Sequence, residues 1–149
     1  MLPEGKLIKD KLVLYELGLP DDIKLTKKSL IRWIALSLGL ISPNESRTIS
    51  INVFETLINF HLKGIEPTMK EIIKDLASNG VKADEKSVYY HILKMKEINL
   101  IRKKNGKYFF WDGIENKLSQ TIKKLYQEKF DRSFKNIDNA LNALENYKY

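Results

Sequence analysis

The dipeptide Asn105-Gly106 is the sequence feature that most constrains the fold of this chain. A two-residue type I′ turn needs a positive φ at both central positions, and Asn-Gly adopts that conformation readily. The run from Leu100 to Lys104 before the dipeptide and the run from Lys107 to Trp111 after it are both typical of short strands. The sequence therefore predicts an antiparallel β-hairpin.

Two helices are predicted directly before the hairpin. Thr68 and Glu71 have the spacing of a capping box, and Asn79-Gly80 is typical of a helix end. A second helix is expected from Asp84, whose carboxylate can cap it, to Glu97. Its apolar residues fall within about 60° on a helical wheel and predict a core-facing stripe. These residues are Val88, Ile92 and Met95.

Helix, turn, helix and hairpin, in this order, are the arrangement of a winged helix-turn-helix. We therefore predict a mainly α fold with a small β-hairpin wing, in which residues 46–113 form the winged helix-turn-helix domain. Residues 1–45 are expected to form an N-terminal helical extension. Residues 114–149 are expected to form a long C-terminal helix.

Three helices are expected before residue 67. Residues 4–17 alternate charged and apolar side chains and predict an amphipathic helix. Thr26 is expected to cap a second helix, which ends at Gly39. A third helix, starting at Ser46 or Thr48, is expected to run to the next glycine and to be the first core helix of the winged domain.

The C-terminal segment contains no Gly or Pro after Gly113 and predicts one helix over 114–146. Such a helix is about 45 Å long, which exceeds the width of a small winged domain. Part of its apolar side therefore needs another partner, either the N-terminal helices or a second copy of the chain. We favour a homodimer. The apolar residues step first by four and later by four and three, which disfavours one coiled-coil register over the whole helix.

Composition restricts the classes of function. The net charge is +7, and residues 67–113 hold ten basic and six acidic side chains. This excess is compatible with a polyanionic partner, although a lysine-rich solvated surface would give the same count. Cysteine is absent, so disulfides and thiolate metal sites are excluded. No apolar run reaches the roughly 18 residues of a membrane span, and we expect a cytoplasmic protein without a membrane partner.

Signatures of enzyme chemistry are missing from the sequence. Neither His61 nor His91 has a Cys or a carboxylate at metal-ligand spacing on its helix face, and His61 is expected to be either structural or on the surface. No phosphate-binding glycine loop and no nucleophile motif is found. We expect no enzyme activity, no catalytic residue, no metal site and no cofactor, although scattered carboxylates leave open a pair that the fold brings together.

The helix 84–97 presents side chains suited to DNA on the side away from its apolar stripe. Ammonium groups bind guanine acceptors or phosphates, and hydroxyl groups bind base edges or phosphates. The alternative is that the two tyrosines pack against neighbouring helices and that the lysines are only solvated. The candidates on this helix are Lys86, Ser87, Tyr89, Tyr90 and Lys94.

Two further groups of residues are expected to contact the DNA backbone. The first comprises Thr68 and Lys70, at the start of the preceding helix, where backbone N–H groups favour a phosphate. The second lies on the hairpin and should add affinity and salt dependence rather than sequence preference. It comprises Arg102, Lys103, Lys104, Asn105 and Lys107.

The runs PTxxEI, SVYYHILKMKEINLI and KKNGKYFFW resemble the winged helix-turn-helix of prokaryotic transcriptional regulators of the MarR and PadR types, and of predicted archaeal regulators. The resemblance covers about 50 of the 149 residues. Asn99 stands where such proteins usually have glycine, and asparagine tolerates the left-handed conformation. The resemblance implies a dimer whose two recognition helices bind a pseudo-palindromic site.

The expected function is therefore a sequence-specific, double-stranded DNA-binding transcriptional regulator, with the helix 84–97 in the major groove and the wing 101–111 on the flanking backbone. The alternative is a winged-helix protein-interaction module in a transcription or replication assembly, without base readout. A cleft beside the N-terminal helices could hold an effector, but no set of residues identifies a small molecule.

Overall fold

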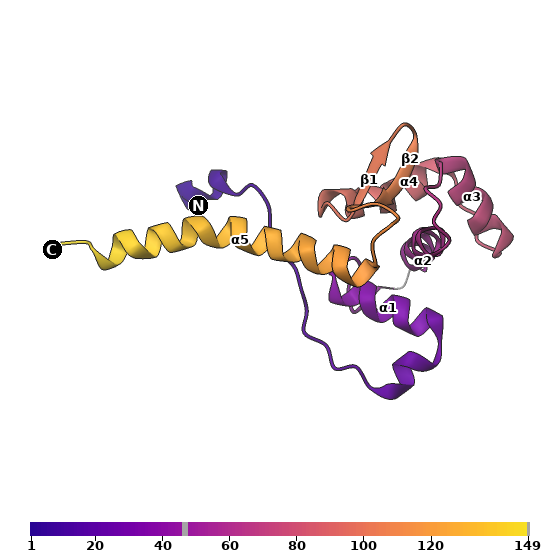
Figure 1. The fold of residues 1–149 in the computed structure, drawn as a ribbon, viewed down its shortest axis with the longest axis horizontal. Helices are drawn as coiled ribbons and strands as arrows, with labels where there is room; N and C mark the ends of the chain where they lie inside the picture. The colour runs from indigo at the N-terminus through magenta and orange to yellow at the C-terminus, as the bar shows by residue number, and fades with distance from the viewer. Residues whose placement is uncertain (46–47, 149) are drawn as a thin grey trace.

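The computed structural model describes residues 1–45 and 48–148. Figure 1 shows helices α1–α4 and the hairpin gathered at one end of the molecule, with helix α5 extending away from them. The prediction of a mainly α fold with a small hairpin is confirmed. The α-helices are α1 (Lys27–Ser37), α2 (Ile49–Leu62), α3 (Met69–Ser78), α4 (Glu85–Glu97) and α5 (Leu118–Glu145). The other elements are strands β1 (Ile101–Lys104) and β2 (Lys107–Phe110) and the 3-10 helices η1 (Pro3–Leu7) and η2 (Asp21–Leu25).

Side-chain caps fix the starts of three helices as predicted. Thr68 and Glu71 form the full capping box of α3, because each side chain accepts a hydrogen bond from the other residue's backbone N–H. Asp84 Oδ1 accepts from the backbone N–H of Ser87 at 2.8 Å and begins α4. Thr26 caps α1 in the same way. The starting residues of α3 and α4 are thus set by local hydrogen bonds that the sequence encodes.

The hairpin has the predicted turn. Asn105 has a φ of 54° and Gly106 a φ of 75°, and Lys104 pairs with Lys107 across the turn. A feature that the sequence did not predict lies beside it, because the Tyr108 N–H donates to the carbonyl of Pro67 at 2.8 Å. The chain entering α3 therefore pairs with β2 and fixes the hairpin against the start of that helix.

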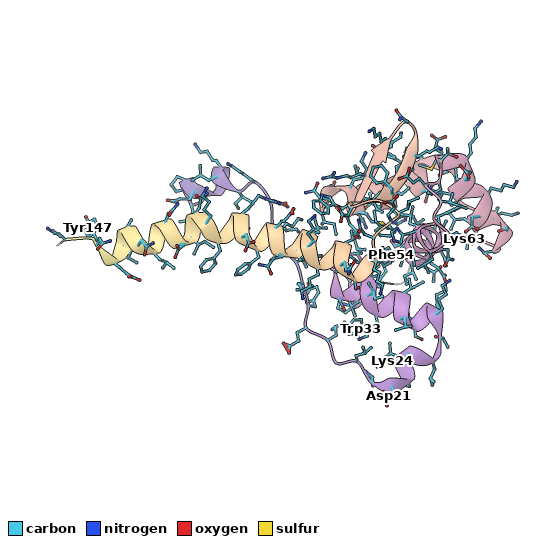
Figure 2. All side chains as sticks on the ribbon, in the orientation of Figure 1. Asp21, Lys24, Trp33, Phe54, Lys63 and Tyr147 are labelled. Atoms are coloured by element: carbon cyan, nitrogen blue, oxygen red, sulfur yellow. The ribbon has the colours of Figure 1, made fainter. Side chains whose placement is uncertain are left out.

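The core lies between α2, α3, α4 and the hairpin. Phe54 of α2, labelled in Figure 2, meets Phe110 of β2 edge to face, with 6.4 Å between the ring centroids. The predicted apolar stripe of α4 is fully buried, which confirms it: Val88, Ile92 and Met95 are at most 2% exposed. Helix α1 packs on α2 through Ile31 and Ala35.

The predicted helix over 4–17 is wrong. The structure has η1 at Pro3–Leu7 and chain without regular secondary structure over 8–20. We call residues 1–20 the N-terminal segment. This segment makes tertiary hydrogen bonds instead, because the Tyr15 N–H donates to the carbonyl of Ser37 and the Trp33 indole donates to the carbonyl of Gly18. An isolated helix of this length is marginal, so these contacts with α1 outweigh the helical pattern.

One predicted helix start differs from the structure, and another falls outside the described residues. Helix α5 begins at Leu118 instead of 114, because the Asn116 side chain donates to the Asp112 carbonyl and the Asn116 carbonyl accepts from His61, which holds the linker in a turn. The proposed start of the third helix at Ser46, and the domain boundary there, fall outside the described residues. Among the residues that are described, α2 begins at Ile49.

The two halves of α5 have different surroundings. In the first half Leu125 is buried against the rest of the protein, and Lys129 Nζ lies 3.5 Å from Asp10 Oδ2 of the N-terminal segment. From Phe130 to Lys148 every residue is exposed. In Figure 1 this second half extends beyond α1–α4, with the N-terminal segment beside it. No helix in residues 1–45 and 48–148 combines the length and apolar character of a membrane span.

Candidate nucleic-acid interface

The outward side of α4 is built from two tyrosines and two lysines. Tyr89 is 41% and Tyr90 53% exposed, so neither belongs to the core. Lys86 is exposed, whereas Lys94 is half-buried. The burial of the opposite stripe fixes this orientation, because a rotation of α4 that hid the tyrosines would expose Val88, Ile92 and Met95.

Lysine ammonium groups lie over both tyrosine rings. Lys94 Nζ is 4.9 Å from the ring centroid of Tyr90, and Lys96 Nζ is 5.9 Å from that of Tyr89. Such cation–π contacts hold flexible lysines close to the helix surface while their charge still faces solvent. The result is a cationic and aromatic surface one helix wide.

His91 is a structural residue of α4 that sequence reasoning did not place. It is only 5% exposed, and its Nδ1 shares a 2.8 Å hydrogen bond with Ser50 Oγ of α2. The Tyr90 ring stands edge-on to the His91 ring. The two hydrogen-bonding residues are 41 positions apart, so no local pattern could have shown the pair.

The hairpin presents the second group of cations. All five predicted residues of the hairpin are exposed. The Arg102 guanidinium lies 5.1 Å from the Trp111 ring centroid, and Lys103 Nζ lies 5.4 Å from that of Tyr108. Lys104, Asn105 and Lys107 surround the turn itself. Strand β1 packs against α4, so the hairpin and the outward side of α4 belong to one part of the molecule.

The start of α3 joins the hairpin through the Thr68–Lys107 bridge. Lys70 is exposed there, whereas the hydroxyl of Thr68 is occupied in the capping box, where it also donates to Glu71 Oε1 at 3.0 Å. The backbone N–H and the hydroxyl of Thr68 lower the pKa of Glu71, and the nearby Lys107 lowers it further. A carboxylate therefore lies among the cations at this edge.

We call the twelve predicted residues the α4–hairpin face. Among them, the structure pairs Thr68 with Lys107 of the hairpin. Lys86, Ser87 and Tyr90 instead line a hollow shared with Thr48 and Asp84. The hollow lies at the start of α4.

Of the two positions that the sequence left open for His61, the structure has the structural one. It is 6% exposed, its Nε2–H donates to the carbonyl of Asn116 at 2.9 Å, and its ring meets Phe110 edge to face. Within the described part of the chain there is no group of three or more His, Cys, Asp or Glu side chains placed to hold a metal ion.

Comparison with known proteins adds no assignment. No protein-family model, no curated protein and no solved structure matches the chain.

Proposed function

We propose that α2, α3, α4 and the hairpin form a winged helix-turn-helix domain that binds double-stranded DNA sequence-specifically and regulates transcription. The observation that carries the proposal is the two-sided character of α4. One side of the helix is fully buried, and the other presents Lys86, Tyr89, Tyr90 and Lys94 to solvent. A short, rigid helix with a cationic and aromatic outer side fits the major groove of B-DNA.

In this proposal α4 reads the bases and the hairpin holds the backbone. Lys86 and Lys94 reach guanine acceptors or phosphates, while the hydroxyl groups of Ser87 and the two tyrosines bond base edges. The hairpin cations contact the flanking backbone or the minor groove, and Lys70 contacts a phosphate at the start of α3. The protein acts as a homodimer that presents two copies of α4 to a pseudo-palindromic site.

Replacing Lys86 and Tyr90 together with alanine tests the reading side. Duplexes selected from a random-sequence pool by the wild-type protein supply the probe, and fluorescence anisotropy measures affinity. We expect a loss of at least about tenfold for the selected duplex, because two base contacts contribute roughly 1–3 kcal/mol each. Both side chains lie outside the core, so the thermal unfolding midpoint should not change.

The matched control is Lys63→Ala with Tyr15→Ala, which removes one exposed lysine and one exposed tyrosine elsewhere. The control should leave DNA affinity unchanged. If the Lys86→Ala, Tyr90→Ala protein still bound the selected duplex with full affinity, α4 would not be the reading helix.

The same surface also suits a second candidate function, a protein-interaction module. Tyr89 and Tyr90 are exposed together, and carboxylates flank α4 at Asp84, Glu85 and Glu97. Exposed tyrosines are enriched at protein interfaces, and acidic neighbours weaken attraction to DNA. Absence of binding to duplex DNA at low ionic strength, with salt-resistant binding to a protein partner, would favour this function.

A further inference from the structure

The second half of α5 carries an apolar stripe that the described part of the chain leaves uncovered. Its five residues are between 42% and 68% exposed, and the sequence spacing along the stripe is four, three, four, three. The first two aromatic rings stack on each other, with centroids 5.4 Å apart. The stripe consists of Phe130, Phe134, Ile137, Leu141 and Leu144.

The stripe points away from the rest of the protein. On a wheel of about 100° per residue its members fall within about 80°, and the buried residues of α5 lie about 140° from its centre. Those buried residues are Thr121, Leu125 and Lys129. The N-terminal segment also lies on their side, because Asp10 pairs with Lys129 and Leu7 shares a hollow with Arg132 and Asn136.

The spacing defines a heptad with the stripe at positions a and d. The residues that flank the stripe then fall at positions e and g. Position e holds an acidic side chain in every heptad: Asp131, Asp138 and Glu145. Position g holds none: Ser133, Ala140 and Tyr147.

We propose that this stripe binds the same stripe of a second copy as a parallel, two-stranded coiled coil over residues 130–147. In a parallel pair, position g of one helix faces position e of its partner, so every carboxylate faces an uncharged side chain. In an antiparallel pair, position e faces position e. Asp138 would then face Asp138, and Asp131 would face Glu145, which places like charges along one whole edge.

The coiled-coil proposal rests on the proposed function, and parallel pairing suits that function. It brings both copies of α2–α4 and the hairpin to the same end of the coiled coil. Because the buried side of α5 lies opposite the stripe, both domains are on the outside and do not block the pairing. In the antiparallel register with Asp138 facing Asp138, the two Leu118 ends, and with them the two domains, would instead lie about 60 Å apart along the axis.

Cysteine cross-linking tests the orientation, and the chain has no native cysteine to interfere. The Phe130→Cys and Leu144→Cys variants of the whole chain are made separately, and each carries a tag of a different mass. The two variants are then mixed and oxidised at neutral pH. Parallel pairing predicts 130–130 and 144–144 disulfides and no 130–144 disulfide. A dominant 130–144 product, or no cross-link in either variant, would overturn the proposal.

Sedimentation equilibrium tests the stripe itself. Ile137→Asp should raise the dimer dissociation constant by about 100-fold or more, because it buries a carboxylate without a partner. Asn139→Asp adds the same charge on the other side of α5 and should leave the constant within about threefold of the wild-type value. Equal effects of the two variants, or a monomeric wild type, would overturn the proposal.

These measurements contain no DNA. The thermal unfolding midpoint of the buried core should be unchanged in both α5 variants, which separates loss of pairing from loss of folding. A failure of the coiled coil would overturn the homodimer but not DNA binding by α4, which the anisotropy measurement tests by itself, whereas a failure of DNA binding would leave the coiled coil in place.

Discussion

At the residue scale, three residues with positive φ set the turns on either side of strand β1. Asn105 and Gly106 both have positive φ and close the hairpin, and Asn99 has a φ of 63° at the end of α4. The residue types at these three positions predicted the positive φ, because few residues other than glycine and asparagine adopt this conformation at low cost. The sequence could not predict the hydrogen bond between His91 and Ser50, since it depends on how α2 and α4 pack.

Glu71 makes stability depend on pH at the start of α3. Hydrogen bonds from Thr68 lower its pKa in the folded protein below the ordinary value of 4.5. A lowered carboxyl pKa stabilises the folded state fully above pH 4.5, and this stabilisation is lost as the pH falls through the folded pKa. Glu71→Ala should therefore be less stable than the wild type at pH 7, and the difference should shrink at lower pH.

Urea unfolding of the two proteins between pH 7 and pH 3 measures this effect. Glu71→Gln is the informative companion variant, because glutamine keeps the reach of the capping box but does not titrate. Its stability relative to Glu71→Ala should be the same at every pH. A wild-type advantage that stayed constant down to pH 3 would contradict a role for the ionised carboxylate.

At the element scale, the sequence predicted elements with local signals and missed those that depend on distant contacts. The capping box of α3, the Asp84 cap and apolar stripe of α4, and the hairpin dipeptide each involve residues only a few positions apart, and the structure has each of them. The pairing of Pro67 with Tyr108 joins segments 41 residues apart, and a proline carbonyl gives no strand pattern. The N-terminal segment also depends on α1, which a helical wheel of residues 4–17 cannot represent.

The contact between the N-terminal segment and the end of α1 can be tested at Gly39. A Cβ atom at Gly39 would lie 2.6 Å from Val13 Cγ1, and Gly39 has a φ of +72°. Gly39→Ala should therefore destabilise the protein by about 1–3 kcal/mol, from backbone strain and the clash together. Gly64→Ala separates these causes, because Gly64 has the same φ and open space around its Cβ position.

Chemical denaturation measures the free energy of unfolding of the single and double variants. Gly39→Ala should lose more stability than Gly64→Ala, and adding Val13→Ala should recover the excess. If both glycine variants lost the same stability, Val13 would not pack against the end of α1, and the N-terminal segment would not be held there.

At the scale of the whole molecule, the proposed DNA binding predicts different roles for the two parts of the α4–hairpin face. The hairpin cations are exposed around a turn that has no apolar side chain at its tip, whereas the α4 residues stand on a helix whose opposite side is fully buried. A flexible cation on the DNA backbone supplies affinity by releasing counterions, and it does so on any sequence. The two groups should therefore be separable by salt and by sequence.

Lys104→Ala with Lys107→Ala should weaken binding to selected and to random duplexes by the same factor. The slope of log affinity against log salt should fall in magnitude by roughly one for each lysine removed from each copy, because about 0.9 counterions are released per phosphate neutralised. The Lys86→Ala, Tyr90→Ala protein should instead lose its preference for the selected duplex.

The control is Lys123→Ala with Lys135→Ala, which removes two exposed cations of α5. It should change neither the salt slope nor the preference for the selected duplex. Anisotropy titrations between 50 mM and 300 mM salt measure both slopes. A hairpin variant that kept the wild-type slope would mean that the wing lies off the DNA, and α4 would then have to bind without a backbone clamp beside it.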